Sequence, residues 1–163
     1  MNKPPPPPPP PRGGGGTLDI SIAALQAAFQ TGYRAHVTDH GLQCVTFPRW
    51  FVTNYTTLTY TRGHNGNTTA ASIANVNGLP PPTSTLVGVP SVFSTSGAVA
   101  TWGGSVGPFG HTGIVLSMNS TTGMATVIHT GNRASGQTPN SWIHNYSFPA
   151  ASVTFLYLGG HLI

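Results

Sequence analysis

Charged side chains are scarce in this chain of 163 residues. They make up 5% of it, against about a quarter in an average soluble domain. The acidic residues are Asp19 and Asp39 alone, with no glutamate. A glycosidase with two catalytic carboxylates, a carboxylate-rich calcium loop and a two-metal phosphoryl-transfer site all need more acidic groups than this. The same scarcity excludes a helical bundle held together by salt bridges.

The six lysine and arginine residues are scattered and form no basic stripe, so the formal charge of +4 reflects a shortage of acids. We therefore expect no nucleic-acid partner. No apolar run approaches the length of a membrane span, so we expect no membrane partner either. The first three residues are followed by prolines instead of an apolar segment, and the sequence thus predicts no secretory signal peptide.

Cysteine is almost absent. Cys44 is the single one, which excludes an internal disulfide and a zinc cluster of several thiolates. A lone cysteine is either a small buried apolar residue or a nucleophile. Among the seven histidines, only His36 and His40 have the i, i+4 spacing of helical metal ligands, and they lie in a loop-like stretch. We therefore expect no metal and no cofactor.

The N-terminal segment has an unusual composition. Residues 4–11 are all proline and residues 13–16 are all glycine. Eight prolines favour a polyproline II rod about 25 Å long at roughly 3.1 Å per residue, and the glycines favour a swivel. The rod is either a solvated spacer or a docking peptide for an aromatic groove in a partner. We divide the chain into a tail, 1–16, and one domain, 17–163.

Apolar spacing predicts helices in the first part of the domain. Ile22, Leu25 and Phe29 recur at helical intervals in a segment that opens near residue 17 and that Gly32 should end. A second helix is predicted over residues 44–55. The stretch 56–90 is polar and rich in turn residues, so a long loop is expected there, with at most one short helix near 69–76.

The second part of the domain has the pattern of strands. Short apolar runs with a period of two alternate with turn residues. The predicted strands cover residues 98–102, 112–118, 124–129 and 153–158. The second and third of these should form a hairpin through a turn at 119–123. Helices followed by an antiparallel sheet indicate an α+β domain.

Cys44 stands at the start of the second predicted helix. The positive end of a helix dipole lowers the pKa of a thiol, which favours a thiolate at neutral pH. Gly41 allows a sharp turn into this helix, and backbone amides at its start could bind an oxyanion. These features suit a nucleophile, although a buried structural cysteine fits the same residues.

Two histidines flank the predicted hairpin. His111 precedes an apolar strand between glycines, and His129 ends the strand that follows. If the two strands pair, both histidines lie at the same end of the sheet, where the second can face the first. A general base needs such an orienting partner. A purely structural role is the alternative for each.

Four motifs in this order, GLQCV, GAVATW, GHTGIV and ATVIHTGN, resemble the CHAP domains, the cysteine- and histidine-dependent amidohydrolases and peptidases related to the NlpC-type enzymes. The resemblance spans residues 18–158. It implies a papain-like α+β fold in which N-terminal helices pack on a small antiparallel β-sheet. It also implies a peptidoglycan hydrolase that cuts a cell-wall amide bond, as an N-acetylmuramoyl-L-alanine amidase or an endopeptidase.

The resemblance assigns roles residue by residue. Cys44 matches the nucleophile and His111 the general base, while Gln43 would help to shape the site. Family members usually carry Glu, Asp or Asn at the third position. Here the matching residue is His129, and Asn132 is the other candidate, because either can orient an imidazole without giving it a negative partner.

An aromatic substrate groove is also implied, with Trp102 and Phe109 as candidates, while Trp50 suits core packing better. Because no signal peptide is predicted, we expect a bacteriophage enzyme that is attached to the virion tail or released to the wall. Peptidoglycan is then its partner, and other virion proteins could bind the polyproline segment. A catalytically silent wall-binding or structural module of a particle, and a peptidase directed at proteins, are the alternatives.

Overall fold

A computed structural model of the chain describes residues 18, 20–33, 44–62, 65–95, 110–119, 121–130, 141–146 and 153–163. It contains three α-helices, α1 (Ile22–Tyr33), α2 (Thr46–Tyr55) and α3 (Thr69–Val76), and two short 3-10 helices, η1 (Gly66–Thr68) and η2 (Gly159–His161). The five strands are β1 (Ser91–Thr95), β2 (His111–Asn119), β3 (Met124–Thr130), β4 (Ser141–Tyr146) and β5 (Val153–Tyr157).

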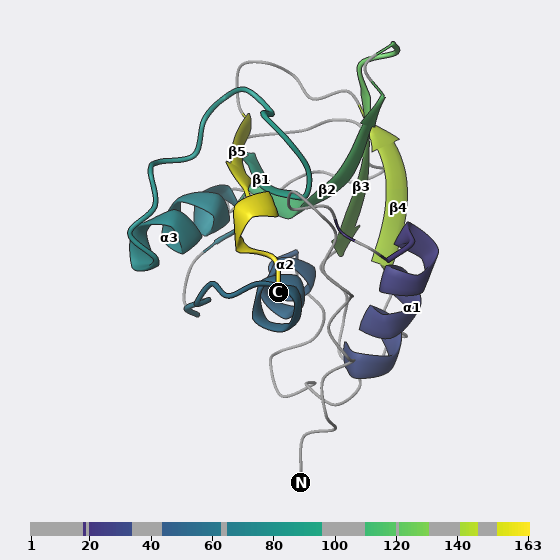
Figure 1. The fold of residues 1–163 in the computed structure, drawn as a ribbon, viewed down its shortest axis with the longest axis horizontal. Coiled ribbons are helices and arrows are strands. Elements are labelled where there is room, and N and C mark those ends of the chain that lie inside the picture. The colour runs from purple at the N-terminus through teal and green to yellow at the C-terminus, as the bar shows by residue number, and fades with distance from the viewer. Residues whose placement is uncertain are drawn as a thin grey trace, which may run out of the picture.

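The strands form one sheet in the order β4-β3-β2-β1-β5, and every described pairing is antiparallel. Figure 1 shows α1, α2 and α3 together along one side of this sheet. The helices come first in the chain and the strands follow. This is the α+β architecture that the sequence predicted, with N-terminal helices packed on a small antiparallel sheet.

The two faces of the sheet pack into two separate apolar clusters. Val92, Ile114 and Ile128 join the cluster that includes the buried residues of the three helices. Val115 and Val127, their neighbours along the strands, belong to a second cluster on the opposite face. This arrangement follows from the period of two along a strand. Because the central strands are buried on both faces, their ends are a firm support for side chains that do chemistry.

Helix α1 begins at Ile22, five residues after the predicted opening near residue 17. The hydroxyl of Ser21 accepts a hydrogen bond from the backbone N–H of Ala24 at 3.1 Å and so caps the helix start. Leu25 and Phe29 are fully buried, as the apolar spacing predicted. The helix runs one residue past Gly32, because a glycine weakens a helix without being obliged to end it.

Helix α2 provides most of the aromatic core. Phe47, Trp50 and Phe51 are buried, and the ring of Phe47 meets that of Phe29 edge to face, with the ring centroids 5.0 Å apart. The expected core role of Trp50 is therefore confirmed. Helix α3 has the predicted bounds of 69–76, within the stretch expected to be mainly loop.

Two strands were not predicted. β1 lies in the interior of the sheet between β2 and β5, and β4 is at its edge. All five residues of β1 are buried, so its sequence, SVFST, lacks the alternation of apolar and polar residues that marks a strand with one wet face. The predicted strand at 98–102 lies outside the described residues.

The predicted hairpin of β2 and β3 is confirmed. Its turn is closed by a hydrogen bond from the N–H of Gly123 to the carbonyl of Asn119 at 2.8 Å. The side-chain oxygen of Asn119 also accepts bonds from Thr121 and Thr122. Gly123 has φ of 71°, a left-handed conformation that glycine adopts without strain. This turn sets the pairing that brings His111 and His129 to the other end of the hairpin.

Candidate active site

The rings of His111 and His129 are in direct contact. Nε2 of His111 lies 3.2 Å from Nδ1 of His129, a hydrogen-bonding distance at which one nitrogen donates to the other. The ring centroids are 5.1 Å apart, and the ring planes are nearly perpendicular, at 79°. The two imidazoles therefore lie at the same end of the sheet with the ring of His129 facing the ring of His111, as the predicted hairpin required.

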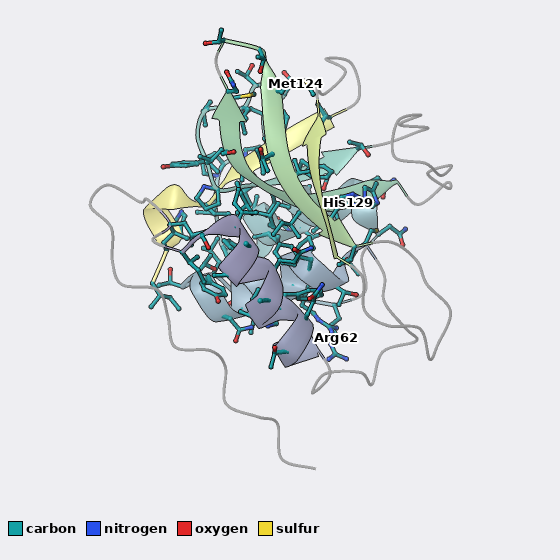
Figure 2. The ribbon with its side chains drawn as sticks, turned by 90° about the vertical axis from the view of Figure 1, so that its right-hand side faces the viewer. Arg62, Met124 and His129 are labelled. Carbon is teal, nitrogen blue, oxygen red and sulfur yellow. The ribbon has the colours of Figure 1, made fainter. Side chains whose placement is uncertain are left out.

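The strand register explains how the rings meet. Ile114 pairs with Ile128, and continuing this pairing by one residue brings Gly113 opposite His129. His111 is two residues before Gly113 and is thus diagonal to His129 on the same face, within reach of a ring. Gly113 has no side chain to come between them. Figure 2 shows His129 at the end of β3 beside the helices, with Met124 at the far end.

The chain enters β2 through a constrained residue. Gly110, directly before His111, has φ of 71°, where L side chains are strained. A Cβ at this position would also collide with the carbonyl oxygen of Thr95 and would lie 2.5 Å from Cβ of Asn67. Glycine is therefore required here, and the tight entry fixes the position from which the His111 side chain projects.

Cys44 lies in a turn just before α2. The helix begins at Thr46 with Val45 as its N-cap residue, so the prediction that the cysteine opens the helix was wrong by two residues. The Cys44 sulfur receives hydrogen bonds from the backbone of Thr112, of Cys44 itself and of Val45. The bond from Thr112 reaches across from β2, and it ties the cysteine to the residue that follows His111.

Gly66 in η1 brings the cysteine and the histidine into one location. A Cβ built on Gly66 would lie 3.0 Å from the sulfur of Cys44 and 2.9 Å from the α-carbon of His111. The sulfur and the His111 backbone therefore both approach the same face of this glycine. The structure thus brings together three of the predicted site residues, Cys44, His111 and His129.

The resting protonation states differ from the expectation. Burial raises the pKa of the Cys44 thiol, although the three backbone hydrogen bonds act in the opposite direction. The predicted lowering of this pKa was wrong, because Cys44 lies before the helix and is largely removed from water. Burial also lowers the pKa of His111, to about 4. At neutral pH both groups are therefore uncharged.

Tyr60 is a further neighbour of the cysteine turn that sequence reasoning missed. Its hydroxyl lies 3.5 Å from the carbonyl oxygen of Val45. Burial raises the pKa of Tyr60, as does the nearby Cys44, so its phenol stays protonated. Gly66 and Tyr60 lie in the polar stretch that was identified only as loop, while Thr112 stands in the GHTGIV motif but was given no role there. Their contribution depends on tertiary contacts that a linear pattern does not contain.

The other predicted site residues lie outside the described residues. These are Gln43, Trp102, Phe109 and Asn132. Their roles stay predictions, and so does the choice of Asn132 over His129 as the orienting group.

The described ranges contain no group of three or more histidine, cysteine, aspartate or glutamate side chains placed to hold a metal ion. The spaced histidines His36 and His40 are outside these ranges. None of the described helices is both long and apolar enough to cross a bilayer.

Comparison with known proteins identifies one family. A family model described as the CHAP domain matches residues 32–132, more than half of the chain. The match includes Cys44, His111 and His129. Searches of curated proteins and of solved structures gave no match.

Proposed function

Because this chain belongs to the CHAP domain family, we propose that it is a peptidoglycan hydrolase that cleaves a cell-wall amide bond, as an N-acetylmuramoyl-L-alanine amidase or an endopeptidase. One observation carries the proposal. The sulfur of Cys44 and the backbone of His111 adjoin the same glycine, Gly66, while the His111 ring is bonded to His129. A thiol, a base and a group that orients the base are the parts that covalent amide hydrolysis requires.

His111 acts as the general base through Nδ1. A neutral imidazole has one N–H, and if Nε2 of His111 donates it to Nδ1 of His129, the lone pair is left on Nδ1 of His111. Nδ1 is also the ring nitrogen nearer the backbone of its own residue, and the α-carbon of His111 adjoins Gly66, as the Cys44 sulfur does. In this arrangement His129 is the acceptor, and it holds the ring of His111 in the tautomer and orientation that a base needs.

Acylation begins from the uncharged pair. Nδ1 of His111 takes the thiol proton as the sulfur of Cys44 attacks the amide carbonyl, and the carbonyl oxygen becomes an oxyanion. Backbone N–H groups of Cys44 and Val45, which already point to the sulfur, are suitably placed to bind it. The C–N bond then breaks, and His111 gives the proton to the leaving amine. An acyl thioester remains on Cys44.

Deacylation reverses these roles. His111 takes a proton from a water molecule, and the resulting hydroxide attacks the thioester carbonyl. The C–S bond breaks, the carboxylic acid product leaves, and the sulfur of Cys44 recovers its proton from His111. No redox partner or metal is needed for the balance of this sequence.

Purified sacculi test the proposal. The full chain should clear a suspension of sacculi and release fragments, and Cys44→Ala should release none, because the thioester cannot form. New amino and carboxyl groups in the soluble fragments, identified by mass, distinguish the amidase from the endopeptidase. If the native chain and Cys44→Ala clear sacculi equally, or if neither clears them, the hydrolase proposal is wrong.

A catalytically silent wall-binding or structural module is the second candidate. The uncharged state of both Cys44 and His111 favours it, since neither group is activated in the free protein. The residue bonded to the His111 ring is an imidazole where relatives usually have Glu, Asp or Asn. A silent module should sediment with sacculi and release no fragment from them.

Attachment to a phage virion is the cellular setting that we propose. It is supported by the low charge of the chain and by the proline run at residues 4–11, which suits docking to a groove in another virion protein. Antibodies against the protein should detect it in purified particles, and deletion of residues 4–11 should remove it from them. Its absence from particles would contradict this setting.

A further inference from the structure

Asn67 lies in the wall of the candidate site. It follows Gly66, whose α-carbon faces the sulfur of Cys44 and the backbone of His111. On its other side, a Cβ built on Gly110 would lie 2.5 Å from Cβ of Asn67 and 2.8 Å from its backbone nitrogen. Asn67 is therefore packed between the two glycines that adjoin the cysteine and the histidine.

The side-chain oxygen of Asn67 lacks a hydrogen-bond partner in the part of the chain that the structure describes, although this oxygen is buried. A buried polar atom without a partner costs free energy, on the order of 1–3 kcal/mol, so folded proteins rarely retain one. Because this orphaned oxygen belongs to a residue directly beside the cysteine and the histidine, a substrate bound there can supply the missing partner.

Two other half-buried asparagines, Asn77 and Asn54, have side-chain amides that are hydrogen-bonded within the protein. Asn77 accepts a bond from the N–H of Thr59 at 2.8 Å and donates bonds to the carbonyls of Thr59 and Ile73, each at 2.8 Å. Asn54 donates to the carbonyl of Trp50 at 2.8 Å. These two amides hold the fold together.

The side-chain oxygen of Asn67 makes no such bond within the described residues, so rotation about the χ2 angle breaks no bond to this atom. This torsion is soft in asparagine. Rotation exchanges the acceptor and donor ends of the amide, so that either can face the site. A peptide group of a substrate offers the complementary N–H and C=O.

We propose that Asn67 is a substrate-binding residue whose side-chain amide hydrogen-bonds a peptide group of the wall peptide beside the scissile bond. This inference rests on the proposed function. It identifies the recognised part of the substrate as an uncharged peptide unit next to the reacting carbonyl. A residue with this role contributes to affinity and leaves the fold no more stable than it would be without the amide.

The test combines kinetics, binding and stability in the full chain. Asn67→Ala should raise the concentration of sacculi that gives half the maximal rate about tenfold, as expected for the loss of one hydrogen bond. The rate at saturation should change less than about twofold. Its Tm should equal or exceed that of the native chain, because no hydrogen bond within the protein is lost. Asn67→Leu, of similar size, keeps the test valid if the alanine variant is poorly folded.

Asn75→Ala is the matched control, since Asn75 is exposed on α3, eight residues farther along the chain. It should leave all three measurements unchanged. An unchanged half-saturating concentration in Asn67→Ala, or a fall in Tm that accounts for its lost activity, would overturn the inference while the proposed function stands.

Sedimentation with sacculi separates the two proposals. In a Cys44→Ala background, the added Asn67→Ala change should weaken binding about tenfold. If the native chain releases no fragments, the proposed hydrolase fails, and this binding measurement still decides the role of Asn67. Equal binding with and without the Asn67 amide would then contradict it, and weaker binding would support it.

Discussion

Cys44 and His111 approach each other across a position that has no room for a side chain. The methyl group of an alanine at Gly66 would lie 3.0 Å from the Cys44 sulfur and 2.9 Å from the His111 α-carbon. The second neighbour is backbone, so a rotamer change of a side chain does not relieve the contact. The closeness of nucleophile and base therefore depends on η1 as much as on the two residues themselves.

Gly66→Ala should lower the rate of wall hydrolysis by about 100-fold, because a displacement near 1 Å is enough to misalign reacting groups. Gly160→Ala is the control, since a Cβ at Gly160 would meet nothing within 4 Å. Circular dichroism should show both variants folded. Full activity in Gly66→Ala would mean that Cys44 and His111 do not work together across this turn.

His129→Glu should make the pH profile more like that of a site with a carboxylate. An anion beside His111 stabilises its imidazolium form and raises its pKa from about 4 by roughly one to three units. Because His111 must be neutral to act as a base, the acid limb of kcat/KM should move to higher pH by the same amount.

His129→Phe is the companion variant, and it should lose activity across the whole profile because the ring of His111 is no longer oriented. If the role of His129 were merely structural, both variants would lose stability and neither would shift the acid limb of kcat/KM.

Alkylation by iodoacetamide reports on Cys44 alone, because the chain has one cysteine. Burial raises the pKa of its thiol, so the fraction of reactive thiolate at pH 7 should be smaller than in a free thiol. We expect slow alkylation at pH 7 that accelerates on the alkaline side of about 8.5, with N-acetylcysteine as the reference. Fast alkylation that is independent of pH between 5 and 8 would instead reveal a thiolate paired with protonated His111.

The acid side of the stability curve should depend on His111. Its pKa is about 4 in the folded protein and about 6.5 in an unfolded chain, so between these values the unfolded state binds the extra proton. Stability should therefore fall as the pH drops from about 6.5 to 4, by about 3 kcal/mol. His111→Gln should remove most of this slope in denaturant titrations. An unchanged slope would contradict the lowered pKa.

Tyr55→Phe should leave the stability unchanged or raise it by about 1 kcal/mol. The ring of Tyr55 is buried against Phe51, with ring centroids 5.4 Å apart, while its hydroxyl is buried and has no hydrogen-bond partner within the described residues. Removing an unsatisfied hydroxyl and keeping the ring loses no favourable contact. A loss of more than about 1 kcal/mol in denaturant unfolding would show that the hydroxyl is bonded.

The sequence predicted those parts of the fold that have a repeating pattern. Leu25 and Phe29 marked α1 by their spacing, and the β2 and β3 hairpin was marked by two apolar runs around a turn. β1 was missed, since a strand buried on both faces has no alternation, and Phe93 alone does not identify one.

The site was predictable to the extent that it depends on residue type and strand pairing. The contact between His111 and His129 could be predicted from the sequence because a hairpin has a fixed register. The protonation state of the Cys44 thiol could not be predicted, because its pKa depends on how deeply the turn is buried. Gly66 and Asn67 were missed because a contact across a turn leaves no periodic signal.

The hairpin has a second end, which is free of these constraints. Met118 and the turn at 121–123 are exposed, and Figure 2 shows Met124 at the opposite end of β3 from His129. Exposed side chains at a loop tip can be changed with little cost to the fold. A fluorescent label carried by the side chain at position 118 or 121 would leave the backbone hydrogen bonds of the turn in place, and it would allow the protein to be followed on a cell wall.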